Sequence, residues 1–140
     1  MQDIAATIGV EKVGRVVSDF YDSVQRHATL QVPFGSVHDW SEHKTHLAHF
    51  WWVTLGGKPY RDKPYRVAQK HAAAGFTPEL LVDWLALFRE TLAGHLPADL
   101  AEQWYARAVN IGRSLVLMHE HRNGIRPGPD VPVVARSAAR

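Results

Sequence analysis

The sequence predicts an all-α protein, on three observations. Apolar residues recur at helical steps of three and four in four long stretches, residues typical of helix starts and ends flank those stretches, and no stretch alternates convincingly as a strand would. The chain has 140 residues, of which 46% are hydrophobic and 21% charged. This is the size of one domain, since domains run to about 100–200 residues, and the composition is that of an ordinary soluble globular protein.

The first helix is expected from Val10 to His27. Its apolar positions are Val10, Val13, Val17, Phe20 and Val24, which follow each other at steps of 3, 4, 3 and 4. Valine favours strands, but strands alternate and this spacing does not, so the pattern predicts a helix.

The second helix is expected to begin after Asp39, because Asp39 and Glu42 have the spacing of a capping box. Gly56 and Gly57 are expected to end it. One face is apolar apart from a single histidine, and it carries Trp40, His43, Leu47, Phe50, Trp51 and Leu55.

Three more helices are expected. A short one begins at Pro64 and ends near His71. A long one begins at Thr77 and Pro78, which read as N-cap and first helical residue. Its inner face carries Leu81, Trp84, Leu85, Phe88 and Leu92. The last runs from about Ala98 to His121 with Leu100, Trp104, Ala108, Ile111, Leu115 and Met118 on one face.

The sequence divides into one helical domain, residues 1–122, and a tail, residues 123–140. The tail is rich in Gly, Pro and Arg and has little apolar content, so we expect it to be solvated and disordered.

Several classes of protein are disfavoured. There is no cysteine, which excludes disulfides, thiolate metal sites and a cysteine nucleophile. The first ten residues lack the basic start and apolar core of a signal peptide, and no apolar run approaches the length of about 18 residues that spans a membrane. The net charge of +2 is weak support for nucleic-acid binding. We therefore expect a cytoplasmic protein with neither a nucleic-acid nor a membrane partner.

The second helix carries three histidines, His43, His46 and His49. Steps of three residues turn about 300°, so the outer two lie about 120° apart and do not readily share one metal ion. We interpret His46 and His49 as surface residues on a helix flank. His43 falls on the apolar face, where a satisfied core or boundary histidine is the ordinary interpretation.

Four residues gain meaning when they are considered together. An inward tyrosine (Tyr21), an inward histidine (His43), a tryptophan (Trp84) and a histidine ending a short helix (His71) are each unremarkable alone. Jointly they are the parts of a haem pocket, with an iron ligand on one side and hydrogen-bond donors on the other.

The chain resembles the group III truncated haemoglobins. The matching segments span about Val10 to Met118 in the family's order, and they are Phe20 to Val24, Leu30 to Phe34, Asp39 to His43, Leu47, Phe50-Trp51, Tyr60 with Pro64, His71, and Phe76 to Phe88. The chain departs from the family at Asp62, where members usually have glycine, and in the length of the interval from Pro64 to His71. The resemblance implies a truncated globin fold, a two-over-two helical sandwich enclosing haem b (iron protoporphyrin IX).

The resemblance also implies roles for residues. His71 matches the proximal iron ligand, and Tyr21, His43, Leu47 and Trp84 match residues on the distal side, where gases bind. The remaining cofactor contacts fall into two groups, packing residues and candidates for binding the haem propionates. The first group is Phe34, Phe50, Trp51 and Phe76; the second is Tyr60, Lys63, Tyr65, Arg66 and Lys70.

The function implied is binding of O2, NO or CO at the sixth iron position, as a bacterial oxygen carrier or sensor. NO detoxification with a reductase partner, or peroxidase-like redox chemistry, would be an added enzyme activity. His43 could act as a gate or could itself reach the iron. The alternative is a haem-free helical interaction module that uses its aromatic faces and basic tail.

Overall fold

The computed structural model describes residues 4–32, 39–61 and 77–122, except for the side chains of residues 119 and 122. Within these ranges the secondary structure is helical and no strand forms. The helices are α1 (Ile4–Ile8), α2 (Val10–Arg26), α3 (Trp40–Thr54), α5 (Pro78–His95) and α6 (Ala98–Arg122). For the described residues the all-α prediction is confirmed, and the predicted bounds of the long helices agree with the structure to within a residue or two. The expected short helix from Pro64 to His71 and the expected tail, residues 123–140, lie outside the described residues.

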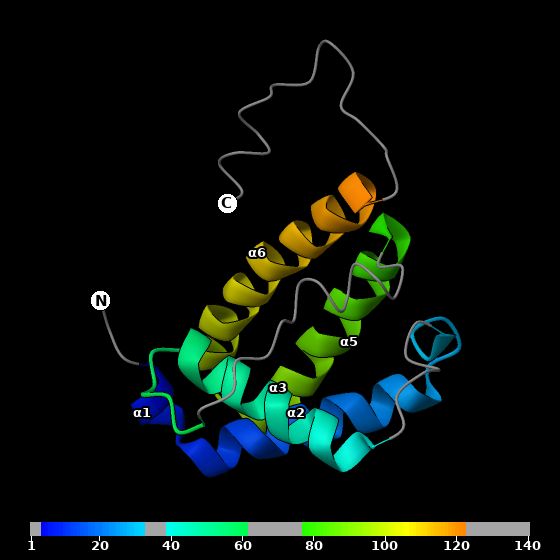
Figure 1. Cartoon of the computed structure of the whole chain (residues 1–140). Coiled ribbons are helices and arrows are strands. Elements are labelled where there is room, and N and C mark those ends of the chain that lie inside the picture. Colours follow the sequence, from blue (N-terminus) through cyan, green and yellow to red (C-terminus); the bar gives the residue numbers. More distant parts are fainter. Residues whose placement is uncertain (1–3, 33–38, 62–76, 123–140) are drawn as a thin grey trace.

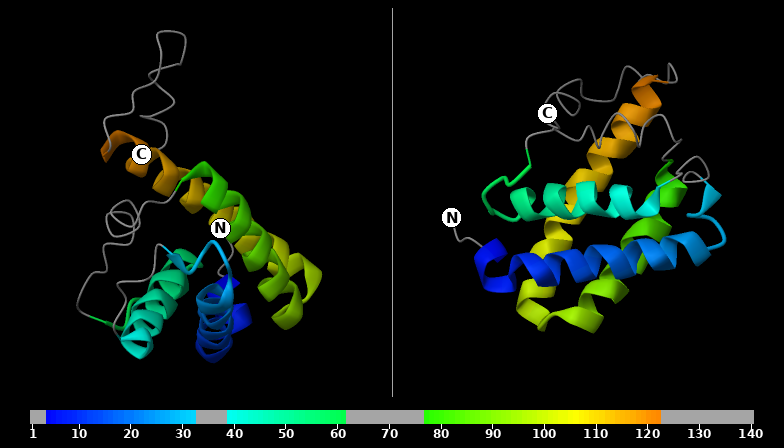
Figure 2. Two further views of the ribbon diagram at one scale, coloured as in Figure 1. Left: turned by 90° about the vertical axis from the view of Figure 1, so that its right-hand side faces the viewer. Right: turned by 60° about the horizontal axis from the view of Figure 1, so that its bottom comes forward.

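The long helices of the described chain lie in two layers. One layer is α2 beside α3, the other is α5 beside α6, and the two pairs cross (Figures 1 and 2). Within each pair the helices are antiparallel, as the colours in Figure 1 show. Side-chain contacts tie α2 to its neighbours, since Lys44 Nζ lies 2.5 Å from Asp22 Oδ1 and His95 Nε2 lies 2.6 Å from Asp19 Oδ2. Just beyond the end of α2, Thr29 donates a hydrogen bond to Asp83 of α5 over 2.7 Å.

The helix boundaries follow local chemistry. Asp39 accepts a hydrogen bond from the backbone N–H of Glu42 over 3.0 Å, and Thr77 accepts one from that of Leu80 over 3.2 Å. These two caps satisfy N–H groups that a helix start leaves without an intrahelical partner. Just past the end of α3, Gly56 has φ of 107°, a conformation that glycine adopts at little cost.

Helix α1 is absent from the sequence prediction. It has only five residues, too few to display a helical period. Tertiary contacts hold it in place, because Ile4 and Ala5 are buried and the backbone N–H of Ala5 donates to the carbonyl of Leu55 over 3.1 Å. This contact joins the beginning of the described chain to the end of α3.

The core is an aromatic cluster centred on Phe88 of α5, which is fully buried. Its ring meets rings from three other helices: Phe20 of α2 at 4.8 Å between centroids, Trp51 of α3 at 5.5 Å and Trp104 of α6 at 5.8 Å. Trp84, one turn earlier on α5, stacks on it at 5.6 Å. The cluster therefore holds both layers together.

Replacing Phe88 with alanine should lower the free energy of unfolding by about 3–5 kcal/mol, because it leaves a cavity where four rings meet. Val82→Ala, on the same helix, is the control: Val82 is 68% exposed, and its truncation should change stability by less than about 0.5 kcal/mol. Chemical denaturation followed by far-UV circular dichroism measures both. Equal stability losses in the two variants would contradict the assignment of Phe88 to the centre of the core.

Two residues of the predicted inward faces are exposed, and both lie at helix ends. Val10, the first residue of α2, is 46% exposed, and Met118, near the end of α6, is 38% exposed. A side chain at Gly112 would overlap that of Leu81, which places these residues opposite each other in the antiparallel pair. In that antiparallel register, Leu115 of α6 lies opposite Pro78, the first residue of α5. Met118 lies beyond that point and has no α5 residue opposite it.

Candidate functional site

Tyr21 of α2 and His43 of α3 meet where the two helices pack. Their ring centroids are 5.6 Å apart in an edge-to-face arrangement, and Tyr21 is only 1% exposed. Trp40, one turn before His43, completes a three-ring group, at 5.3 Å from His43 and 6.1 Å from Tyr21. The sequence places Trp40 on the same helix face as His43 but does not identify it as a site residue.

Two further distal candidates surround this group. Leu47 follows one turn after His43 and is 1% exposed, and Trp84 of α5 is 2% exposed. The ring of Phe20 contacts both Trp84 and Tyr21, at 5.7 Å from the first and 4.8 Å from the second between centroids. Trp84 Nε1 and His43 Nε2 are both buried atoms. The structure thus gathers hydrogen-bonding side chains from α2, α3 and α5 in an otherwise apolar region.

The packing candidates on α3 lie beside this region. Trp51 is buried and belongs to the aromatic core through its stacking on Phe88, whereas Phe50 is half-buried and touches Trp51 at 5.3 Å between centroids. The other candidates of the sequence analysis fall outside the described residues, among them the predicted iron ligand. They are Phe34, Lys63, Tyr65, Arg66, Lys70, His71 and Phe76.

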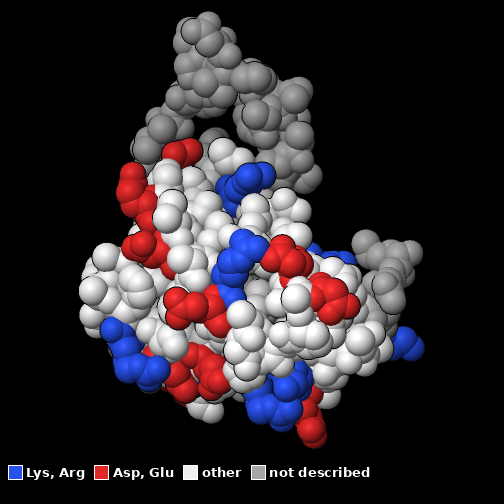
Figure 3. All heavy atoms as spheres, turned by 180° about the vertical axis from the view of Figure 1, so that it is seen from behind, with Lys and Arg blue, Asp and Glu red and all other residues white. Residues whose placement is uncertain are grey.

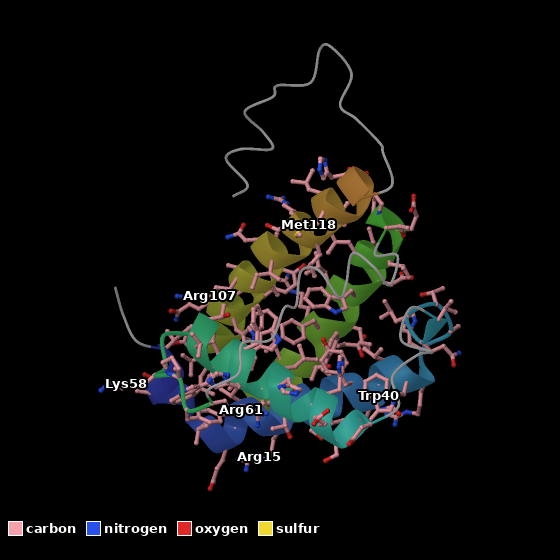
Figure 4. All side chains as sticks on the ribbon, in the orientation of Figure 1. Arg15, Trp40, Lys58, Arg61, Arg107 and Met118 are labelled. Atoms are coloured by element: carbon pink, nitrogen blue, oxygen red, sulfur yellow. The ribbon has the colours of Figure 1, made fainter. Side chains whose placement is uncertain are left out.

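Beyond the end of α3 the chain turns back along that helix, and this return builds a second polar group. The backbone N–H of Tyr60 donates to His49 Nε2 over 3.1 Å, and the two rings meet at 4.6 Å. Arg61 Nη2 lies 3.4 Å from His46 Nδ1. We call Arg61, His46 and His49 the Arg61 cluster (Figure 4 labels Arg61 against α3). Both histidines are half-buried, so they are more enclosed than the sequence analysis predicts.

Burial lowers the pKa of His49 below its ordinary value, and the nearby charge of Arg61 and the proximity of His46 lower it further. The pKa in the folded chain is thus below that in the unfolded chain, so the unfolded chain takes up this proton first as the pH falls. The free energy of unfolding is therefore not reduced by His49 well above pH 6.5. It decreases as the pH falls below 6.5 toward the lower pKa of the folded chain.

Arg61→Gln should therefore raise the pKa of His49 toward its ordinary value, because it removes a positive charge beside the imidazole. Titration of the histidine ring resonances by NMR measures the shift. Arg15→Gln is the matched control, since Arg15 is an exposed residue of α2 and its loss should leave His49 unchanged. Identical His49 titrations in the parent and in Arg61→Gln would contradict this description of the cluster.

Two hollows open on other parts of the described surface. One, of about 420 Å³, lies between α2 and α5 and includes Asp19, Asp22, Glu90 and His95 in its lining. The other, of about 230 Å³, lies between α5 and α6 and has an apolar floor that includes Leu92 and Leu96. Neither is lined by Tyr21, His43 or Trp84.

Acidic and basic side chains are interspersed on the face opposite that of Figure 1 (Figure 3).

In the described ranges, no group of three or more His, Cys, Asp or Glu side chains is placed to hold a metal ion. Every helix of that part of the chain is too short or too polar to cross a bilayer.

No protein-family model, curated protein or solved structure matches the chain. Any assignment of function therefore depends on the residues themselves.

Proposed function

We propose that the protein binds haem b between α3 and α5 and takes up diatomic gases, O2, NO or CO, on the side of Tyr21 and His43. The observation that carries the proposal is the contact between these two side chains. Tyr21 and His43 come from different helices, yet they meet at 5.6 Å beside the buried Leu47. The segmental resemblance to group III truncated haemoglobins and the two-layered arrangement of α2, α3, α5 and α6 support the same assignment.

The described residues fit such a cofactor in their chemistry. Pockets for cofactors are mostly apolar with a few placed polar groups, and this region offers Leu47 and Phe50 beside Tyr21, His43 and Trp84. Arg61, which lies against α3, has a buried Nε atom. None of the described residues accepts a hydrogen bond from this atom. In the proposal His71 would supply the iron ligand.

When bound, haem supplies the iron at which the gas binds. The chain's own residues then tune the affinity. The hydroxyl of Tyr21 and the indole N–H of Trp84 can donate a hydrogen bond to the ligand, and tryptophan can only donate. His43 donates from one tautomer, and its half-buried position suits a side chain that controls access. NO detoxification with a reductase, or peroxidase-like chemistry, would use this same donor set.

The aromatic rings of the core are not available to the haem-free interaction module. That alternative needs aromatic faces at the surface, but Phe20, Phe88, Trp84 and Trp104 are all at most 2% exposed. They are occupied in holding the described helices together.

Titration of the haem-free protein with haemin tests the proposal. The chain has five tryptophans, three of which, Trp40, Trp51 and Trp84, border the proposed site, so haem binding should quench their fluorescence with an endpoint at one haemin per chain. The same titration in denaturant is the control for non-specific association. Quenching without an endpoint, or the same curve for folded and unfolded chains, would refute the proposal.

A further inference from the structure

We infer that the Arg61 cluster is a binding site for a carboxylate group. If the protein binds haem, that carboxylate is one of the haem's propionates; this second step rests on the proposed function, whereas the anion site does not.

The first argument is charge. Arg61 carries a positive charge at every accessible pH. Among the described residues the ion pairs are Lys44–Asp22, Arg89–Glu102 and His95–Asp19, and none of them neutralises Arg61. Its Nε is buried and has no acceptor among these residues. A buried charged donor without an acceptor is costly, and an incoming carboxylate would remove that cost through charge-assisted hydrogen bonds.

The second argument is the protonation of the two histidines. A guanidinium and a backbone N–H can only donate, so His46 Nδ1 and His49 Nε2 must be the acceptors in their contacts with Arg61 and Tyr60. The neutral His49 ring then carries its proton on Nδ1. The lowered pKa of His49 agrees with a neutral ring. The cluster thus combines one fixed positive charge with an N–H donor on His49, and none of its three members is a carboxylate.

The third argument is position. His46 comes one turn after His43 on α3, so the cluster lies at the edge of the helix face that carries His43 and Leu47. Arg61 reaches it from the segment that returns along α3 (Figure 4). A porphyrin against that face would present its acid side chains at its rim, where water and cations can meet them. The cluster would hold one of those acids while Tyr21 and His43 face the gas ligand.

The anion site is tested on the haem-free protein with sodium acetate as the probe. Acetate should cause saturable shifts of the His46 and His49 ring resonances, and sodium chloride at the same ionic strength should not reproduce them. Arg61→Gln should abolish the saturation, and Arg15→Gln should leave it intact. Shifts that do not saturate, or that persist in Arg61→Gln, would overturn the site.

A second measurement identifies the source of the carboxylate. Arg61→Gln should speed the dissociation of haemin about tenfold or more, but should leave unchanged the dissociation of haemin dimethyl ester, whose propionates carry no charge. Equal dissociation of haemin from the parent and Arg61→Gln would overturn the propionate assignment, while saturable acetate shifts would still support the anion site. Failure of the parent to bind haemin at all would overturn the proposed function, and the acetate titration would still decide on the site.

Discussion

Replacing His71 with alanine is expected to abolish stable haem binding. In the proposal this side chain supplies the iron ligand, and His71 is the only histidine between His49 and His95. Without it the iron keeps only a distal or an external ligand. We therefore expect the five-coordinate ferrous spectrum to disappear, haem to be lost more rapidly, and added imidazole to restore part of the spectrum by entering the vacated position.

His121→Ala is the control for the loss of a histidine, because His121 is exposed near the end of α6. Its spectrum and haem retention should equal those of the parent. An unchanged five-coordinate ferrous spectrum in His71→Ala, with haem retained at the parent's rate, would show that another residue holds the iron.

The second large effect concerns release of O2. Tyr21→Phe and Trp84→Phe should each raise the O2 dissociation rate about 10- to 100-fold, since each removes a hydrogen bond to a charged ligand worth about 1.5–3 kcal/mol. The two effects should not add in the double variant, because both donors serve one bound molecule. Stopped-flow displacement of O2 by CO measures the rates.

Matched controls are available on α6. Trp104→Phe removes a buried indole N–H of the core, and Tyr105→Phe removes a hydroxyl on α6, where Arg89 lies over the ring at 4.2 Å from its centroid. Neither residue belongs to the distal group, so O2 release should be unchanged in both. If Tyr21→Phe and Trp84→Phe also release O2 at the parent's rate, the distal hydrogen-bond assignment is wrong.

Local signals predicted most of the helical framework. Asp39 and Thr77 mark helix starts through side chains that cap nearby N–H groups, and Gly56 marks an end through its positive φ. Such signals act within a few residues, so the sequence displays them directly. Helix α1 escaped prediction because its stability depends on Leu55, which is 50 residues further along the chain than Ala5.

The candidate site depends more on contacts distant in sequence. Periodicity places Tyr21 and His43 each on an inward face, but only packing of α2 against α3 brings their rings together. For His46 and His49, the helical spacing indicated a flank, and the return of the chain at Tyr60 and Arg61 encloses that flank in part. The sequence near Arg61 does not predict its contact with His46, because the two residues are 15 positions apart in the chain.

The measurement that tests haem binding most directly is the absorption spectrum of the protein in its ferric, ferrous and ferrous-CO forms after addition of haemin. We predict a Soret band distinct from that of free haemin, a ferrous form with one histidine ligand, and a further shift of the band when CO occupies the open position. A protein that stays colourless after removal of excess haemin, or that shows only the spectrum of free haemin in all three states, would contradict the assignment.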